Sequence, residues 1–409
     1  MAKQNKPAIR FKEFTDAWEQ RKLGEVVKEV TRNDPTSEVP IMMITANNGF
    51  IEQSERYAFD NAGESLKKYI LLQKGELAYN HGASKLRPFG SCFALTTAES
   101  ARIPFVYHCF SAENQNAEFL SIELNGSEVE SQLRKIVSSG ARMDGLLNIS
   151  FDEYSTVTVL LPDIKEQEHI ADFFRNLDHL ITLHQRKYDK LQVLKKAMLE
   201  KMFPKNGSSV PEIRFKGFTD AWEQRKLSEI AGKVTEKNTG LQYVETLTNS
   251  AEFGIISQRD FFDHDISKLG SLDGYYIVRN EDFVYNPRIS TSAPVGPINR
   301  NKLGRTGVMS PLYTVFRPHD IDTTYLEHFF KCGYWYSFMN FNGDSGARSD
   351  RFSIKDDVFF QMPIPVPHIE EQRKIGLFLT QLDHLITLHQ RELEKLQNIK
   401  KSMLEKMFV

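Results

Sequence analysis

The sequence of 409 residues is poor in cysteine and has no long apolar run. Its three cysteines, Cys92, Cys109 and Cys332, show no Cys-x-x-Cys spacing, so we expect reduced thiols and no metal site. No stretch approaches the roughly 18 uncharged apolar residues of a membrane span, so no membrane contact is expected. The segment MAKQNKPAIRFKEF at the N-terminus has no apolar signal core, which favours a cytoplasmic location.

Catalytic motifs are lacking as well. The segment YNPR at 285–288 only faintly resembles the Asn-Pro-Pro-Tyr/Phe motif of adenine methyltransferases, because the second proline is absent and no glycine-rich cofactor loop accompanies it. A metal-dependent nuclease needs clustered carboxylates and a lysine. The Asp and Lys of PDIKEQE at 162–168 are not kept in its copy PHIEEQR at 367–373. We therefore expect a non-catalytic chain that holds no cofactor and no metal.

Net positive charge is the third absence. The chain has 52 Lys and Arg against 54 Asp and Glu, which gives a formal net charge of −2. Many nucleic-acid-binding domains are clearly basic, so a binder of this composition must concentrate its positive charge locally. Aromatic residues are plentiful, with 29 Phe and 14 Tyr, which argues for packed cores rather than disorder.

The most informative feature that is present is an internal duplication. The segment IRFKEFTDAWEQRKLGEV begins at Ile9 and IRFKGFTDAWEQRKLSEI begins at Ile213, while LDHLITLHQR begins at Leu177 and again at Leu382. Between these shared segments the two halves differ strongly. Solenoid repeats run ~20–50 residues, so a repeat of about half the chain is a domain duplication. It predicts one fold used twice with two different surfaces.

Each half ends in a predicted long helix. From Glu166 to about Met202 there is no Pro or Gly, and apolar residues recur near helical spacing. A helix of ~37 residues is roughly 55 Å long at about 1.5 Å per residue. Matched residues seven apart predict that the two helices pair as a coiled coil, with the histidines setting the register or pairing across the seam. The alternative is that each helix lies on its own domain. The seam positions are Leu177, His184, Leu191 and Met198 in the first copy, and Leu382, His389, Leu396 and Met403 in the second.

The middle of each half has mixed α/β character. Runs such as VTVLLP at 157–162 and LYTVF at 312–316 predict strands, and residues 129–139 and 323–339 predict helices. We therefore predict an α/β fold in which two globular mixed α/β domains are joined by two long helices. These helices form an antiparallel coiled coil, with an internal pseudo-twofold duplication. The expected boundaries are a first domain at 1–162, a helix at 163–203, a linker at 204–214, a second domain at 215–367 and a helix at 368–409.

Two loops without acidic residues are candidates for binding DNA. No Asp or Glu occurs from Phe283 to Pro318, or from Leu77 to Ala98. Lys, Arg, Asn, Ser and Thr contact phosphates, and Arg and Asn also read base edges. The alternative is that these loops are acid-poor by chance. The candidate contacts are Asn80, Lys85 and Arg87 in the first half, and Asn286, Arg288, Arg300, Lys302 and Arg305 in the second.

A repeated Gly-Ala-Arg segment is a second candidate. It occurs at 140–142 and 346–348, so Arg142 and Arg348 occupy matching positions. The glycine permits close backbone approach and the arginine can clamp a phosphate. A structural turn in which the arginine pairs with Asp144 or Asp350 is an equally good interpretation.

These segments together resemble a known family. The leading FTDAWEQRKLGE, the Pro-x-x-x-Glu-Gln before each helix, and LDHLITLHQR with KLQ-x-x-K are similar to conserved regions of the specificity subunit (HsdS) of type I restriction-modification systems. The resemblance covers the whole chain, in the family's order of recognition domain, helix, recognition domain, helix. It implies two target-recognition domains, at 1–162 and 215–367, that each read one half of a split site in double-stranded DNA.

The same resemblance implies the partners of the chain. The helices are expected to set the spacing of the half-sites and to dock methyltransferase subunits, two in number, and restriction/translocase subunits complete a host-defence complex. S-adenosylmethionine, ATP and Mg²⁺ are then expected in the partner subunits and not in this chain.

The helix length gives an estimate of the spacing. If the helices hold the domains apart, about 55 Å corresponds to on the order of 16 base pairs at about 3.4 Å each. Because the two middles differ, the target is expected to be asymmetric. Two other hypotheses stay open at this point: a stand-alone enzyme, which would need the missing motifs, and a scaffold whose repeats bind only protein.

Overall fold

The computed structural model describes residues 5–46, 48–56, 63–137, 147–205, 207–261, 269–344 and 350–408. The chain divides into two compact units. Unit 1 consists of Met1–His184 and Glu392–Val409, and unit 2 consists of Gln185–Arg391. The unit boundaries fall inside the two long helices, so each unit takes a part of both. The domain boundaries expected from the sequence, at the helix ends, stay a prediction.

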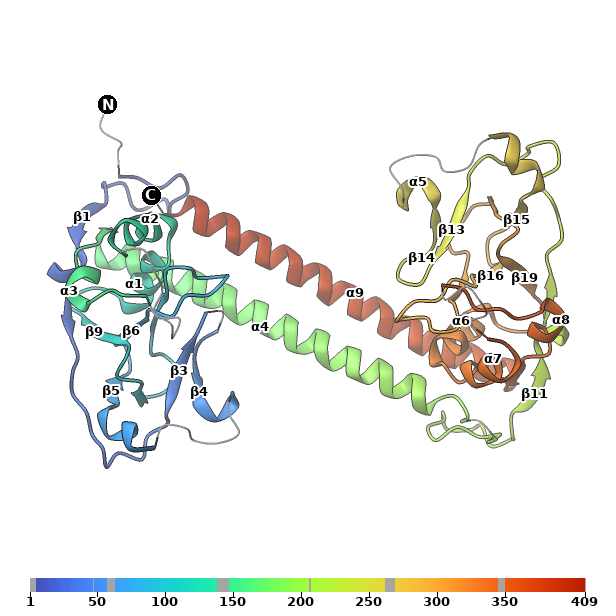
Figure 1. Ribbon diagram of the computed structural model, residues 1–409, viewed down its shortest axis with the longest axis horizontal. Coiled ribbons are helices and arrows are strands. Elements are labelled where there is room, and N and C mark those ends of the chain that lie inside the picture. The colour runs from blue at the N-terminus through green and yellow to red at the C-terminus, as the bar shows by residue number, and fades with distance from the viewer. Residues whose placement is uncertain are drawn as a thin grey trace. The chain divides into compact units, whose positions relative to one another are not determined.

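Unit 1 is built on a four-stranded antiparallel sheet, drawn in blue and teal in Figure 1. Its strand order is β2 (Val27–Glu29), β9 (His108–Ala112), β6 (Leu77–Asn80) and β7 (Ser91–Ala94). Three two-stranded sheets surround it: β1 (Glu19–Lys22) with β10 (Thr158–Leu161), β3 (Met42–Thr45) with β4 (Gly49–Glu52), and β5 (Ile70–Gln73) with β8 (Ser100–Ile103). The short helices are α1 (Ala117–Leu124), α2 (Ser127–Ile136) and α3 (Phe151–Tyr154).

Unit 2 repeats this topology, in yellow and orange in Figure 1. Its four-stranded sheet has the order β12 (Ala231–Lys233), β19 (Thr314–Pro318), β16 (Phe283–Tyr285) and β17 (Ile298–Arg300). The two-stranded sheets are β11 (Glu223–Lys226) with β20 (Pro363–Val366), β13 (Leu247–Ser250) with β14 (Gly254–Ser257), and β15 (Tyr276–Val278) with β18 (Gly307–Met309). The short helices are α5 (Gln258–Phe261), α6 (Thr323–Cys332), α7 (Tyr336–Asn342) and α8 (Asp356–Phe359). The mixed α/β fold and its duplication are therefore confirmed.

Short 3-10 turns complete both units. They are Leu23–Glu25, Gln53–Glu55 and Gly63–Lys68 in unit 1, and Leu227–Glu229 and Leu269–Gly274 in unit 2.

Each unit has two hydrophobic cores. In unit 1 the larger core packs the four-stranded sheet against α1 and the start of the long helix, through Phe110, Phe119 and Phe174. In unit 2 the larger core does the same through Phe316, Tyr325 and Leu379. The second core of each unit packs the opposite face of the four-stranded sheet, through Ala78 and Cys109 in unit 1 and Val284 and Val315 in unit 2, against the two-stranded sheets. Successive residues of a strand point to opposite faces, so the inner strands contribute to both cores. Aromatic side chains are prominent in the larger core of each unit, as their abundance in the sequence leads one to expect.

The two long helices are α4 (Ile164–Lys201), green in Figure 1, and α9 (Ile369–Lys406), red. Each has 38 residues, which is about 57 Å of helix. Within unit 1, Lys400 of α9 bonds Asp178 of α4 at 2.5 Å, and the rings of Phe174 and Phe408 lie 6.1 Å apart. α9 therefore runs antiparallel to α4 there. Within unit 2, Lys195 of α4 pairs with Asp383 of α9. All eight predicted seam positions are buried or half-buried.

The repeated Pro-x-x-x-Glu-Gln motif connects each long helix to its unit. Glu166 is fully buried and accepts two bonds of 2.6 Å from Arg10, and the buried Glu371 accepts bonds of 2.7 and 2.8 Å from Arg214. The neighbouring Gln167 accepts from the backbone N–H of Asn116, which is the residue that caps α1. The motif therefore fixes the leading segment, the short helices and the long helix to one another.

The ends of the long helices meet the leading segments in the same way in both units. In unit 2 the backbone N–H of Ile213 donates to the carbonyl of Lys201, the last residue of α4, at 2.9 Å. In unit 1 the N–H of Ile9 donates to the carbonyl of Lys406 at 2.9 Å, at the end of α9. The first junction lies within a continuous stretch of chain, whereas the second joins residues that are 397 positions apart in the printed numbering.

Candidate nucleic-acid interface

A repeated Tyr-Asn pair lies at the C-terminal end of one inner strand of each four-stranded sheet, β6 in unit 1 and β16 in unit 2. The Asn80 side chain donates to the carbonyl of Ile44 in β3 at 3.2 Å, and Asn286 donates to the carbonyl of Asn249 in β13 at 2.8 Å. Their oxygens accept from the backbone N–H two residues later, at 2.9 and 3.0 Å. Each asparagine thus ties a neighbouring hairpin to the sheet and starts a turn, which is a typical use of Asn.

The same pair fixes the far end of the following loop. The hydroxyl of Tyr79 donates to the carbonyl of Phe89 at 2.6 Å, and that of Tyr285 donates to Val295 at 2.9 Å. Burial raises the pKa of both tyrosines, so both hydroxyls keep their protons. The loops at 81–89 and 287–295 are therefore held at both ends by the same contacts.

A glycine closes each loop. Gly90 and Gly296 have φ of 81° and 84°, a conformation that L side chains rarely adopt. A Cβ at Gly296 would lie 2.1 Å from the carbonyl oxygen of Asn286, and one at Gly90 would lie 2.6 Å from that of Asn80. Only glycine fits, so the Tyr-Asn pair and the glycine form one scaffold, used twice with the same number of residues between them.

In unit 1 the predicted DNA contacts Lys85 and Arg87 differ in exposure and in their partners within the protein. Lys85 is exposed on the loop. Arg87 instead folds back and donates to the carbonyl of Asn125, the C-cap of α1, at 2.9 Å. Burial lowers the pKa of Arg87, and its guanidinium stabilises the loop from within. Arg142 lies outside the described residues.

In unit 2 most of the predicted cations are paired with carboxylates. Arg300 is 10% exposed and contacts Glu281 at 3.1 Å and Glu327 at 2.7 Å. Lys302 also pairs with Glu327, at 2.7 Å. Burial on its own would raise the pKa of Glu327, but the surrounding cations outweigh it and lower the pKa to about 2. These side chains form an ion cluster around the buried Glu327 of α6, with the Lys302 side chain 55% exposed at its edge.

The remaining cations of this stretch differ in availability. Arg305 makes two bonds to Glu245, at 2.7 and 2.8 Å. Arg288 is 69% exposed and lies 3.8 Å from Asp350, a weak contact. Arg348 lies outside the described residues. Acidic side chains from other parts of the chain therefore contact the cations of this acid-free stretch. Of its predicted cationic contacts, Arg288 is the most exposed.

Sequence reasoning missed two histidines at the first loop, His81 in the loop itself and His108 at the start of β9. His81 is buried, with its ring nitrogens 2.7 Å from the carbonyl of Leu147 and 2.6 Å from that of Val106. The ring of His108 stacks on it at 5.1 Å, and burial lowers the pKa of His108. No sequence signal separates these residues from ordinary loop histidines, because their partners are backbone carbonyls distant in the chain.

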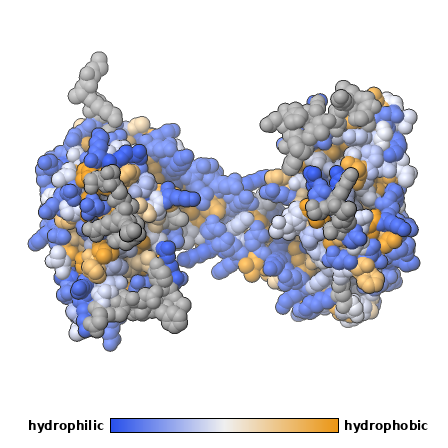
Figure 2. All heavy atoms as spheres, viewed as in Figure 1, coloured by the Kyte–Doolittle hydropathy of each residue, from blue (hydrophilic) through white to orange (hydrophobic). Residues whose placement is uncertain are grey.

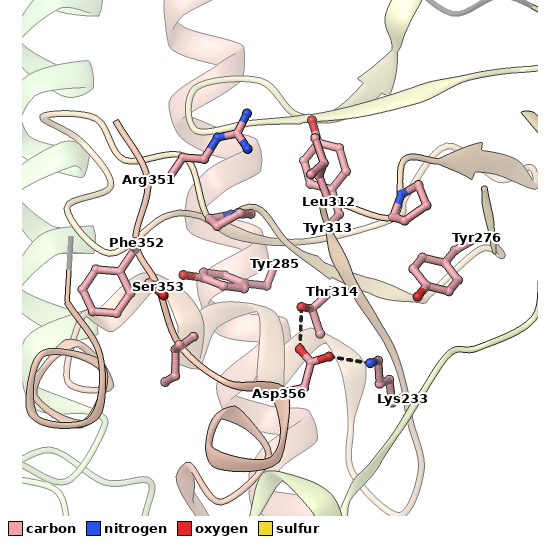
Figure 3. A pocket seen from close by; sticks show the side chains of 13 residues that line it. Lys233, Tyr276, Tyr285, Leu312, Tyr313, Thr314, Arg351, Phe352, Ser353 and Asp356 are labelled. Atoms are coloured by element: carbon pink, nitrogen blue, oxygen red, sulfur yellow. Dashed lines mark hydrogen bonds and ion pairs between the residues drawn. The ribbon is translucent and has the colours of Figure 1, made fainter. Parts of the chain in front are cut away.

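Unit 2 has an open pocket at the position that corresponds to these two histidines of unit 1. It encloses about 470 Å³ and is lined by Tyr276, Tyr313 and Arg351, among others. Figure 3 shows Asp356 on the pocket wall, bonded to Thr314 at 3.1 Å and paired with Lys233. Pro287 and Thr314 stand here where unit 1 has His81 and His108. The two units thus share a scaffold and differ in the side chains around it.

Exposed leucines repeat on the two long helices. Leu180 and Leu183 of α4, and Leu385 and Leu388 of α9, are between 39% and 45% exposed. They occupy the same positions of the duplicated LDHLITLHQR. Figure 2 shows hydrophilic side chains over most of the visible face of each unit, with hydrophobic ones in scattered patches. These leucines are exposed in both copies, so burial within their own unit does not account for them.

Within the described residues, no helix could cross a membrane, and no three His, Cys, Asp or Glu side chains are grouped to hold a metal ion.

Sequence and structure comparisons all find similarity to specificity subunits of type I restriction-modification systems. The family profile of the type I restriction modification DNA specificity domain matches residues 219–398. The chain is 23% identical to the type I restriction enzyme MjaVIII specificity subunit of Methanocaldococcus jannaschii over 300 residues, covering 70% of this chain and 67% of that protein. It is 23% identical to the putative MjaX specificity subunit of the same organism over 425 residues, covering 96% and 93%. The solved S subunit of a type I restriction-modification system from M. genitalium has a TM-score of 0.52 at 13% identity, covering 99% of both chains, which shows a shared fold.

Proposed function

Since this chain belongs to the family of type I restriction-modification specificity subunits, we propose that units 1 and 2 each recognise one half of an asymmetric bipartite DNA site. The subunit itself is non-catalytic, and its family implies double-stranded DNA and the methyltransferase and restriction subunits as partners. S-adenosylmethionine, ATP and Mg²⁺ belong to the chemistry of those partners. The complex would act on DNA in the cytoplasm.

The observation that carries the proposal is the duplicated loop scaffold. Tyr79, Asn80 and Gly90 correspond to Tyr285, Asn286 and Gly296, with the same hydrogen bonds in both units. Between them nine residues read HGASKLRPF in one copy and PRISTSAPV in the other. A constant frame with a variable insert is expected of a reader whose two heads bind different sequences, because loops on a rigid scaffold carry recognition.

The proposed DNA contacts follow from exposure. Lys85 and Arg288 are exposed cations on these loops, suited to a phosphate or a guanine edge. Arg142 and Arg348 remain proposed contacts. The ion-paired Arg300, Lys302 and Arg305, and the internal Arg87, would contribute to DNA binding only if their present bonds open.

The helices are proposed to set the half-site spacing. α4 and α9 each continue without a break from one unit into the other. Inserting seven residues, one heptad, at matching points of both helices keeps the seam in register. We expect the same two half-sites with a longer gap between them. An unchanged gap would contradict this role.

The exposed leucine pairs are proposed to dock the methyltransferase subunits. The same apolar pair is present once on α4 and once on α9, so two copies of one partner fit the duplication. The stoichiometry can be measured by mass spectrometry of the intact complex, with two methyltransferase subunits per chain expected.

The reading of half-sites is tested by exchange of one domain. Residues 24–160 are replaced by the equivalent segment of a relative with a known target, and the methylated motif is determined by sequencing DNA from cells that express the complete methyltransferase complex. We expect one half of the motif to change and the other to stay. A change in both halves would contradict modular reading, and an unmodified genome with the native chain would contradict the function itself.

A further inference from the structure

Each of the two duplicated loops contains a second, smaller turn. In unit 1 the N–H of Ser84 donates to the carbonyl of Arg87 at 3.0 Å, and the N–H of Arg87 donates back to the Ser84 hydroxyl at 3.0 Å. In unit 2 the N–H of Ser290 donates to Ala293 at 3.0 Å, and the N–H of Ala293 donates to the Ser290 hydroxyl at 3.2 Å. The serine is one of two residues that the loops share, the other being the proline at 88 and 294.

These turns leave two residues at each tip. The tips are Lys85–Leu86 in unit 1 and Thr291–Ser292 in unit 2, and all four are exposed. Leu86 is 60% exposed, which is unfavourable for an apolar side chain without a partner. Among the described residues, no side-chain hydrogen bond or ion pair of Lys85 or Thr291 is found within the protein, so their polar groups are open to a ligand.

The difference between the tips indicates what they contact. Phosphates and sugars are alike at every position of a duplex, so a backbone-contacting pair would keep its chemistry in both copies. The tips instead change from a cation with an aliphatic chain to two small hydroxyls, while the turn that carries them is kept. Variation at the tip on a constant frame is the pattern expected of side chains that meet different base edges.

We propose that Lys85–Leu86 and Thr291–Ser292 are the specificity-determining residues of units 1 and 2, presented to base edges in a DNA groove by interchangeable loops. This rests on the proposed function. Lysine suits the O6 and N7 acceptors of guanine, leucine suits the methyl group of thymine, and serine and threonine hydroxyls donate to or accept from either base of a pair. One such contact is worth on the order of a tenfold to hundredfold preference for the correct base pair.

The test exchanges the tips within the chain. The variant Lys85→Thr/Leu86→Ser gives unit 1 the tip of unit 2, and Thr291→Lys/Ser292→Leu does the reverse. The matched control is Lys28→Thr, which removes one exposed cation from β2, at the edge of the unit 1 sheet opposite to β7. Each variant is purified with its methyltransferase partners. Its methylated motif is sequenced, and its affinity is measured for duplexes altered at single positions.

We expect the first variant to change base preference roughly tenfold or more at one or two positions of one half-site, the second to do so in the other half-site, and the control to do neither. Thermal unfolding should be unchanged in all three, since the side chains are exposed.

Two results would overturn the inference while leaving the proposed function intact: variants that keep the native motif and preferences, or variants whose affinity falls equally for all duplexes with a shallower salt dependence, which indicates phosphate contact. If the native complex itself modifies no bipartite site, the proposed function fails first.

Discussion

The buried ion pair at the start of α9 gives the sharpest prediction about stability. Glu371 is fully buried and both of its oxygens are held by Arg214, which is itself 13% exposed. Replacing Arg214 by Met keeps most of the side-chain volume and leaves a buried carboxylate without its cation. Breaking a buried pair in this way typically costs about 3–5 kcal/mol. The unfolding equilibrium of unit 2 should therefore shift by a factor of roughly a hundred to several thousand.

If the unpaired Glu371 carboxylate is the cause, stability should be lost in unit 2 alone and not throughout the protein. Hydrogen exchange of the full chain, read by mass spectrometry, should show faster exchange in Gln185–Arg391 and little change in the other unit. The matched variant Arg10→Met removes the partner of Glu166 and should place the loss in unit 1 instead. The double variant Arg214→Met/Glu371→Leu should recover much of the stability, because no unpaired charge is left.

Two outcomes would refute the reasoning. A loss below about 1 kcal/mol for Arg214→Met would mean that the Arg214–Glu371 pair contributes no more to stability than an exposed ion pair does. A double variant as unstable as the single one would mean that packing, and not the unpaired carboxylate, causes the loss.

Three further predictions concern the loop, the helices and pH. Gly296→Ala should cost unit 2 more than about 2 kcal/mol and weaken only its half-site in a binding assay, because the added Cβ would lie 2.1 Å from a carbonyl oxygen at positive φ. Leu385→Asp/Leu388→Asp should weaken methyltransferase binding at least tenfold in a titration while the melting temperature stays near the native value, since both leucines are exposed. Burial raises the pKa of Glu123 from 4.5 to about 7, so its contribution to stability is present below pH 4.5 and lost as the pH rises through about 7. Glu123→Gln should then stabilise unit 1 by about 3 kcal/mol at pH 8 and hardly at all at pH 4, as measured by urea unfolding; equal effects at both pH values would contradict this.

The sequence predicts well those features that depend on periodicity and repetition. A seam such as Leu177, His184 and Leu191 needs only regular spacing to be recognised, and the helices α4 and α9 form where that spacing occurs. The duplicated fold follows for the same reason, because two copies of similar sequence adopt the same strand order.

The candidate site is predicted less well because its electrostatics depend on distant residues. Arg300 lies in an acid-free stretch, yet Glu327 reaches it from α6 and Glu281 from the turn before β16. The charge of Arg87 predicts a DNA contact, but its guanidinium donates a hydrogen bond to the carbonyl of Asn125. Local composition therefore predicted candidate loops, which stay a prediction, but it could not show which of their side chains are exposed.

Asn80 and Asn286 show the opposite case. Both are predicted DNA contacts, because asparagine can contact phosphates and read base edges. In the structure Asn80 and Asn286 bond to neighbouring hairpins and to their own loops. A repeated residue at the edge of a variable segment can be the frame that permits the variation.

The junction of Ile9 with Lys406 has a consequence for how such genes can change. It reproduces, between the two ends of the described chain, the hydrogen bond that Ile213 makes to Lys201 inside it. Because the two junctions are equivalent, we expect a chain whose halves are encoded in the opposite order to form both junctions as well. If each unit reads one half-site, as proposed above, exchange of one half would combine an existing recognition unit with a new one, and a small set of halves would specify a much larger set of DNA targets.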